Sequence, residues 1–245
     1  MKNVPAFLLA CILFSGCVTG TRTDSKPDEP GKVAMKKDGT IILLHGQGRT
    51  RLSMVILGKR FKSSGYQTLN FPYNQTSDSL DEISDQLIGF IREKVKTTSY
   101  HLIGHSLGNI IIRNAFREEY PAGLGKIVML APPNQPAHLA KLLTKNLIYR
   151  WFTGDSGQKL SEEEFYRDLP APTVPFGVIA GDKGQSLTFS EPNDAVVTVE
   201  STKLEGMADW LLLHHGHTFI MNCKDTFEYC QHFIERGRFK QPEPE

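Results

Sequence analysis

Apolar runs and amphipathic segments alternate along the chain between residues 39 and 240. The apolar runs are short, which is typical of buried strands. We predict strands at residues 40–44, 66–71, 100–104, 126–130, 174–180 and 209–213. The amphipathic segments carry apolar residues at helical spacing. They predict helices at residues 52–63, 107–117 and 225–236, and Gly237 ends the last of these. A further helix carries apolar residues from Leu80 to Val95, and Ser77 or Asp78 can cap its N-terminus.

This alternation predicts the architecture. Strands that alternate with helices form a parallel sheet covered by helices on both faces, so the fold class is α/β. Residues 133–172 interrupt the pattern with a predicted helix at 137–152 and a polar loop. We interpret them as a lid inserted into one domain at residues 39–240.

The most informative motif is Gly104-His105-Ser106-Leu107-Gly108, which lies where the strand at 100–104 meets the helix at 107–117. Gly-x-Ser-x-Gly alone is a weak signal, but a strand-turn-helix is the context that a nucleophile elbow requires. The two glycines leave room for a strained turn, and the helix N-terminus favours negative charge beside Ser106. The motif therefore predicts Ser106 as a nucleophile.

From Ile41 through Phe239 the chain resembles the α/β-hydrolase superfamily, and more closely its bacterial lipase and esterase members with a compact lid. The resemblance implies a mostly parallel central sheet flanked by helices, with a small helical lid. It also implies a serine hydrolase that needs no cofactor. In this family the nucleophile, the acid and the histidine follow one another along the chain in that order.

The resemblance also implies an oxyanion hole. In the family, a His-Gly turn after the first strand supplies one backbone N–H, which here belongs to Gln47 in His45-Gly46-Gln47. The N–H after the nucleophile, that of Leu107, supplies the second. We interpret His45 as a residue that holds this loop. Arg49 is either a structural partner or a substrate contact, and the sequence leaves both open.

The predicted base is His217. It stands in His217-Thr218-Phe219, between the last strand and the last helix, where the family places its catalytic histidine. His215 is the alternative. A zinc site made of His214, His215, His217 and Cys223 is disfavoured, because adjacent histidines on a strand point to opposite faces and the spacing fits no standard zinc pattern. We therefore predict neither a metal nor a cofactor.

Two aspartates compete for the role of the acid. Asp194 stands in Asp194-Ala195-Val196-Val197, which is similar to the family's Asp-Gly-Val-Val. Asp182 directly follows the strand at 174–180. We favour Asp194, although Ala195 replaces a glycine that would adopt more backbone conformations. Asp182 is then expected to be a turn residue that bonds its own backbone.

The N-terminus predicts export. Residues 1–16 resemble a signal peptide, and Phe14-Ser15-Gly16-Cys17 resembles a bacterial lipobox, which implies cleavage before Cys17 and lipidation of its thiol. An ordinary secretory signal is the alternative. Residues 17–38 are polar and predict a flexible tether. We expect an anchor in the outer membrane on the periplasmic side, since Val18 is not the aspartate that favours inner-membrane retention.

Composition agrees with a folded domain. The 245 residues are 40% hydrophobic, enough for a sizeable core. The 28 Lys and Arg balance the 27 Asp and Glu, so nothing indicates a nucleic-acid partner. Cys223 and Cys230 lie too far apart along one helix for a disulfide, and we predict free thiols.

Together these observations predict an esterase or lipase that acts on a small-molecule or lipid ester through Ser106, His217 and Asp194. An acyltransferase with the same residues is one alternative. A non-catalytic envelope binding protein on a hydrolase scaffold is the other, because a fold alone does not fix a function.

Overall fold

The computed structural model describes residues 36–135, 167–186 and 190–240. Its centre is a six-stranded sheet in the order β2-β1-β3-β4-β5-β6, with every neighbouring pair parallel. The strands are β1 (Thr40–Leu44), β2 (Gln67–Asn70), β3 (Tyr100–His105), β4 (Leu124–Leu130), β5 (Phe176–Gly181) and β6 (Asp209–Leu213). All six predicted strands are present, and the α/β fold class is confirmed.

The helices follow the predicted pattern with one correction. They are α1 (Val55–Ser63), α2 (Leu80–Lys94), α3 (Leu107–Ala115) and α7 (Lys224–Arg236), with short 3-10 helices η1 (Arg51–Met54), η3 (Glu200–Thr202) and η4 (Ile220–Asn222). Neither Ser77 nor Asp78 caps α2. Ser79 does so in a capping box, in which its hydroxyl accepts from the Glu82 N–H and the Glu82 carboxylate accepts from the Ser79 N–H.

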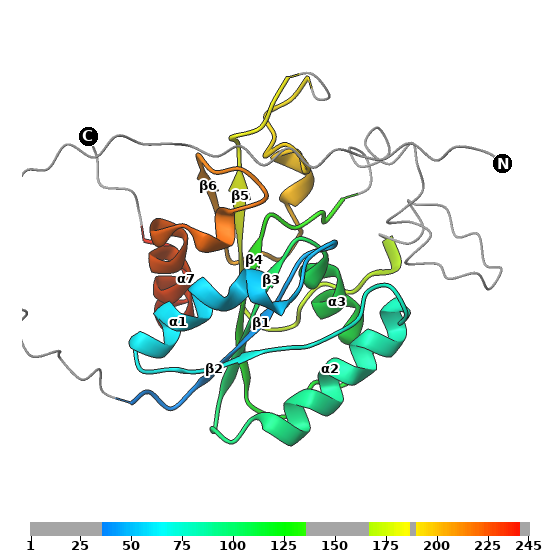
Figure 1. Cartoon of the computed structure of the whole chain (residues 1–245), viewed down its shortest axis with the longest axis vertical. Helices are drawn as coiled ribbons and strands as arrows, with labels where there is room; N and C mark the ends of the chain where they lie inside the picture. The colour runs from blue at the N-terminus through cyan, green and yellow to red at the C-terminus, as the bar shows by residue number, and fades with distance from the viewer. Residues whose placement is uncertain (1–35, 136–166, 187–189, 241–245) are drawn as a thin grey trace, which may run out of the picture. The chain divides into compact units, whose positions relative to one another are not determined.

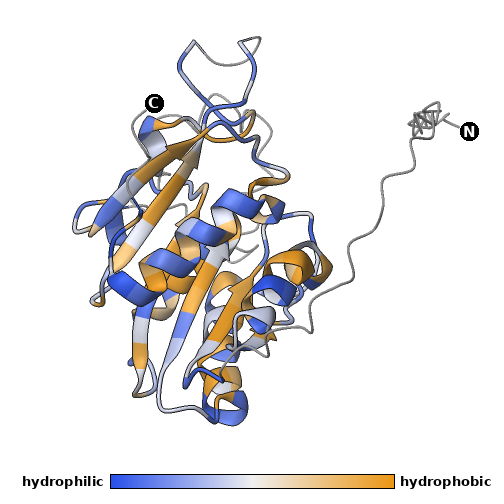
Figure 2. Ribbon diagram, turned by 90° about the vertical axis from the view of Figure 1, so that its left-hand side faces the viewer, coloured by the Kyte–Doolittle hydropathy of each residue, from blue (hydrophilic) through white to orange (hydrophobic). Residues whose placement is uncertain are grey.

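The sheet has a hydrophobic core on each face. Alternate residues of a strand point to opposite faces, and β1 shows this directly: Ile42 and Leu44 belong to the core under α2 and α3, while Ile41 and Leu43 belong to the core under α1 and α7. The two helix pairs flank the sheet in Figure 1. In Figure 2, hydrophobic colours concentrate on the central strands. Strands covered on both faces explain why their sequences read as continuous apolar runs.

Parallel pairing brings the carboxyl ends of the strands to one edge of the sheet. Leu44 of β1 pairs with Gly104 of β3, and His105 pairs with Leu130 of β4. Gly181 of β5 pairs with Leu213 of β6. The loops after β1, β3, β5 and β6 therefore leave from this edge, which is where ligands bind in open α/β sheets.

Several predictions concern the ends and the insertion of the chain. The predicted lid at 133–172 lies largely outside the described residues, as do the signal segment and nearly all of the tether. Within the described ranges, no helix is both long and apolar enough to cross a bilayer. Cys223 and Cys230 are free, as predicted, with Cys223 just before α7 and Cys230 buried within it.

Candidate active site

Ser106 is the one accessible residue of an otherwise buried segment. From Tyr100 through Ala115, every other residue is buried. The Ser106 backbone has φ 50° and ψ −117°, a conformation that residues other than glycine rarely adopt. Its N–H donates to the Leu130 carbonyl at 2.9 Å, which ties the turn to β4. Strain of this kind clusters at functional sites, because the surrounding structure must hold it in place.

Close packing explains the glycines around Ser106. A Cβ on Gly108 would lie 2.7 Å from the Leu44 carbonyl oxygen and 2.9 Å from that of His45. A Cβ on Gly104 would lie 2.3 Å from Asn109 Oδ1. Real Cβ atoms do not approach other atoms so closely. The two glycines of the motif therefore let α3 approach β1 and the turn close on itself.

His217 and Asp194 form a buried pair. His217 Nδ1 and Asp194 Oδ2 are 2.7 Å apart, and the two side chains are 10% and 1% exposed. The other carboxylate oxygen, Oδ1, accepts hydrogen bonds from the N–H groups of Val196 and Val197 at 3.0 and 2.7 Å. A carboxylate that is buried and fully hydrogen-bonded can hold an imidazole in one tautomer and orientation.

The backbone around this pair is also fixed. The His217 N–H donates to the Asp194 carbonyl at 2.9 Å, so the two residues are joined through main chain and side chains. Ala195 has φ 85°, in the left-handed region that favours glycine. This backbone conformation would explain a glycine at this position, such as the one in the pattern Asp-Gly-Val-Val, where this chain has Ala195. Asn193 holds the same turn, because its Oδ1 accepts from the Ala195 N–H at 2.9 Å.

His105 connects the turn of Ser106 to the loop of His217. Its Nε2–H donates to the His217 carbonyl at 2.9 Å, and the two imidazole rings lie 4.8 Å apart. Burial keeps the pKa of His105 well below its usual range, so the ring is neutral. On its other side, a Cβ on Gly46 would lie 2.7 Å from His105 Nδ1 and 3.2 Å from Ser106 Cβ. His105 therefore packs between the predicted nucleophile, the base and the oxyanion turn.

The competing histidines have other partners. His214 Nδ1 lies 2.9 Å from Asp182 Oδ1, and the His214 side chain is 76% exposed. The Asp182 carboxylate thus pairs with His214, and the predicted bond from Asp182 to its own backbone is wrong. His215 Nε2 lies 2.7 Å from Asp225 Oδ2. Three nearby histidines have three different aspartates, and only the pair of His217 and Asp194 is buried.

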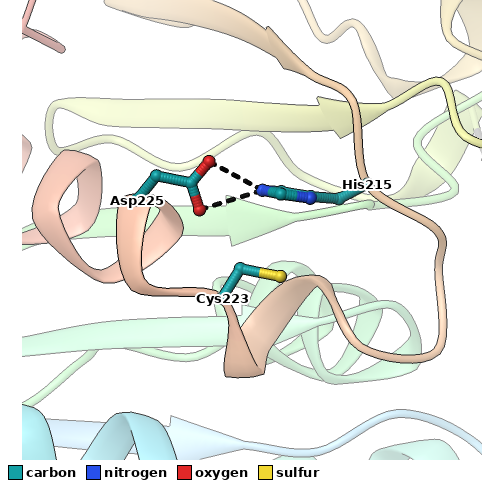
Figure 3. A group of neighbouring side chains, drawn as sticks. All are labelled: His215, Cys223 and Asp225. Atoms are coloured by element: carbon teal, nitrogen blue, oxygen red, sulfur yellow. Dashed lines mark hydrogen bonds and ion pairs between the residues drawn. The ribbon is translucent and has the colours of Figure 1, made fainter. Parts of the chain in front are cut away.

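Among the described residues, His215, Asp225 and Cys223 form one cluster of side chains that could ligate a metal ion (Figure 3). One ligand atom from each residue lies within 4.8 Å of the others. A hydrogen bond joins the imidazole to the carboxylate, and the thiol lies 3.5 Å from the Phe219 carbonyl. Burial and the nearby Asp225 carboxylate raise the pKa of the Cys223 thiol, which keeps it protonated. Each of the three residues therefore has a hydrogen-bond partner within the protein.

One predicted oxyanion donor, the N–H of Leu107, is part of the elbow, and the other, the N–H of Gln47, follows Gly46, which packs closely against Ser106. Leu107 begins α3, where N–H groups have no intrahelical partner. Within the described ranges, neither the Gln47 nor the Leu107 N–H donates to any group. His45 holds the loop: its ring bonds the Gly46 carbonyl at 2.9 Å and stacks on Tyr73 at 4.0 Å. The Tyr73 hydroxyl in turn donates to the His45 carbonyl.

Two cavities adjoin these residues. One, of about 370 Å³, is lined by Asp194, His217 and their neighbours in the loops after β5 and β6. The other, of about 540 Å³, lies beside the oxyanion turn and is lined by His45, Gly48 and the segments that follow β1 and β2. The described residues thus leave space on the base side and on the oxyanion side of the site.

Sequence reasoning overlooked Tyr73 and the role of His105. Tyr73 comes three residues after β2 ends at Asn70, at the same sheet edge as the other loops. That position was a usable signal. The role of His105 depends on contacts with Gly46 and His217, which are far away in the sequence, and no local pattern indicates it.

No protein-family model and no curated protein sequence matches the chain. Solved structures do. A lipase-esterase related protein from Clostridium acetobutylicum is 16% identical, covering 82% of this chain and 98% of its own, with a TM-score of 0.54. A thermophilic esterase from Thermogutta terrifontis is 13% identical, covering 83% and 92%, with a TM-score of 0.54.

The pyrethroid hydrolase PytH is 14% identical, covering 82% of this chain and 98% of its own, with a TM-score of 0.57. At such identities the likeness concerns the fold and not the activity. The strand order, the parallel pairing and the strained serine between β3 and α3 agree with it. The chain therefore has the α/β-hydrolase fold.

Proposed function

We propose that this protein is a serine hydrolase that cleaves carboxylic esters, with Ser106 as nucleophile, His217 as base and Asp194 as the acid that orients it. The observation that carries the proposal is the buried pair of His217 and Asp194 at the sheet edge where Ser106 is accessible. The esterases and hydrolases among structures of the same fold support it.

The protonation of His217 follows from its partner. Because Asp194 accepts at Nδ1, the neutral imidazole carries its proton there and leaves Nε2 with a lone pair. No described group binds Nε2. This nitrogen is therefore the one that takes the Ser106 hydroxyl proton while Oγ attacks the acyl carbon of an ester. Asp194 stabilises the imidazolium that results and stays ionised itself.

The attack makes a bond between Ser106 Oγ and the acyl carbon and places negative charge on the former carbonyl oxygen. The N–H groups of Gln47 and Leu107 are free to donate to that oxygen. Removing one such donor costs about 3–4 kcal/mol in other hydrolases. The positive end of α3 adds to this stabilisation.

The intermediate then loses the alcohol. The bond from the acyl carbon to the alcohol oxygen breaks, and the His217 imidazolium gives its proton to that oxygen. Water attacks the acyl-enzyme in the same way, giving its proton to His217, and Ser106 recovers a proton as the carboxylic acid leaves. The cycle needs only water and the ester.

A chain-length series of p-nitrophenyl esters tests the proposal. Wild-type protein should release p-nitrophenol, and Ser106→Ala should reduce kcat by a factor of about 10⁶. A rise in kcat/KM toward long acyl chains would identify a lipase, and a fall after butyrate an esterase. Product analysis with an added alcohol would reveal acyl transfer. Failure to cleave any ester of the series, with folded protein, would contradict the proposal.

We further propose that the enzyme is anchored to the cell envelope through lipid on Cys17, as the lipobox-like segment predicts. An alkyne-labelled fatty acid should be incorporated in a bacterial host, and Cys17→Ala should abolish the labelling. Label on Cys17→Ala at the wild-type level would contradict the anchor.

A further inference from the structure

We propose that the cavity beside the oxyanion turn binds a negatively charged group of the substrate through Arg49 and Arg51, so that the preferred esters are anionic. This inference rests on the proposed function, and it narrows the substrate class. The group is a carboxylate or a phosphate, which guanidinium groups bind by the same charge-assisted hydrogen bonds.

The charged residues that line the cavity are all positive. Its volume is about 540 Å³, and its lining contains two arginines and no acidic residue. Its described lining residues are His45, Gly48–Arg51 and Pro72–Thr76. A volume in this range suits a small organic group. Cationic side chains without acids attract anions and repel cations, so a neutral or cationic ester gains nothing from these arginines.

Neither arginine has an acidic partner in the described part of the chain. Ion pairs there involve Arg117 and Arg167, but not Arg49 or Arg51. The Arg49 guanidinium carbon lies 6.0 Å from the centre of the Phe219 ring, which comes from the loop of His217. Arg49 thus reaches from the oxyanion side toward the base side. Its charge is available to a ligand.

The charge of Arg49 also acts at the elbow. Burial is the main reason that the pKa of His105 is low, and the positive charge of Arg49 lowers it further. His105 is adjacent to Ser106, so the guanidinium lies within electrostatic reach of the reacting atoms. An anionic group bound by Arg49 would therefore lie near the ester bond that Ser106 attacks.

The loop that presents the arginines is fixed to the next loop. Gln75 Nε2 donates to the Arg49 carbonyl at 3.0 Å, and Asn70 Nδ2 donates to the Arg51 carbonyl at 3.3 Å. Thr50 caps η1, because its hydroxyl accepts from the Leu52 N–H at 3.3 Å. A fixed backbone reduces the ordering cost of binding, which is what a recognition site needs.

Two matched substrate pairs test the inference, one for each side of the ester. On the acyl side, 4-nitrophenyl hemiglutarate is compared with 4-nitrophenyl valerate, in which a methyl group replaces the carboxylate. On the alcohol side, butyrylglycerol phosphate is compared with butyrylglycerol. We expect kcat/KM to be about tenfold higher for the anionic member of at least one pair. The responding pair shows on which side of the ester the anionic group is bound.

Variants assign the preference to the arginines. Arg49→Gln should remove most of it, and Arg49→Lys should keep part, because the charge remains without the planar fork. Arg238→Gln is the matched control, an exposed arginine after α7 and outside the cavity. If Arg49→Gln does not fold, two other measurements test the inference. Arg51→Gln should reduce the preference for anionic esters, and added salt should reduce it in the wild-type protein, since salt screens a half-exposed charge.

Four outcomes overturn the inference. The first is equal kcat/KM within both pairs, in an enzyme that cleaves the neutral esters; the proposed function then stands. The second is a preference that survives both Arg49→Gln and Arg51→Gln. The third is an equal loss for neutral and anionic esters in Arg49→Gln, which would place Arg49 in the stabilisation of every transition state. In the fourth, no ester is cleaved, and the inference falls together with the proposed function.

Discussion

The elbow of Ser106 and the two loops that carry Asp194 and His217 reach their positions by different means. The elbow is held by contacts from neighbouring strands: Gly108 against the carbonyls of β1, and the Ser106 N–H on the Leu130 carbonyl of β4. The loop of Asp194, after β5, consists of turns held by polar groups, with Asn193 and Asp194 accepting from backbone N–H groups. Steric exclusion fixes the first, and hydrogen bonds fix the second.

This difference predicts how each region responds to change. Added volume in the elbow has no space to occupy, so it should reduce stability. Loss of a single carboxylate in the loop should leave the fold intact and remove activity.

Replacing the acid should give the largest effect. Asp194→Asn should lower kcat about 10⁴-fold, because an amide holds the wrong tautomer of His217. Asp182→Asn removes the equivalent group from the exposed pair with His214 and should change kcat by less than about fivefold, since exposed ion pairs contribute little. Steady-state kinetics on one ester measures both. A larger loss in Asp182→Asn than in Asp194→Asn would assign the acid to Asp182.

Crowding the elbow should destabilise the whole domain. Gly108→Ala places a Cβ 2.7 Å from a backbone oxygen and should lower the free energy of unfolding by about 4 kcal/mol. Gly89→Ala in α2 is the control: no atom lies within 4 Å of the new Cβ, and helix propensity should stabilise the protein by about 1 kcal/mol. Urea unfolding of both variants measures the difference. Equal stability would mean that the elbow is not closely packed.

The strand before the elbow should make stability depend on pH. Burial, together with repulsion from Lys126, lowers the pKa of His101 to about 4, and its Nδ1 accepts from the Lys126 N–H. The unfolded chain binds this proton below about pH 6.5, whereas the folded protein binds it near pH 4. The contribution of His101 to the free energy of unfolding should therefore be fully present above pH 6.5 and fall by roughly 3 kcal/mol as the pH drops to 4.

Urea unfolding at several pH values measures this loss. His101→Gln should reduce the slope between pH 6.5 and 4, and the slope that remains should come from the other buried histidines, His105 and His45. An unchanged slope in His101→Gln would mean that other groups cause the pH dependence of stability.

The smallest effect should come from the turn of the acid. Ala195→Gly relieves a left-handed backbone and should stabilise the protein by about 1 kcal/mol. Ala115→Gly at the end of α3 should destabilise by a similar amount, because its backbone is helical. Thermal unfolding compares them. A loss of stability in Ala195→Gly would mean that the turn carries no strain.

Local patterns predicted most of the fold and part of the site. Each strand is an apolar run, because both faces of the sheet are covered. The start of α2 was missed because Ser77, Asp78 and Ser79 are all good caps, and only the reciprocal bond to Glu82 selects Ser79. Asp194 and Asp182 both follow β5, and the preference for Asp194 comes from its similarity to the family's Asp-Gly-Val-Val, because no local pattern shows which carboxylate is buried against a histidine. Long-range packing makes that choice.

The most direct test of the central claim, that Ser106 is a nucleophile activated by His217, is intact mass spectrometry after reaction with a fluorophosphonate probe. The wild-type protein should gain the mass of one adduct. Ser106→Ala should gain none, and His217→Ala should react far more slowly while remaining folded. An adduct on Ser106→Ala at the wild-type rate would contradict the account.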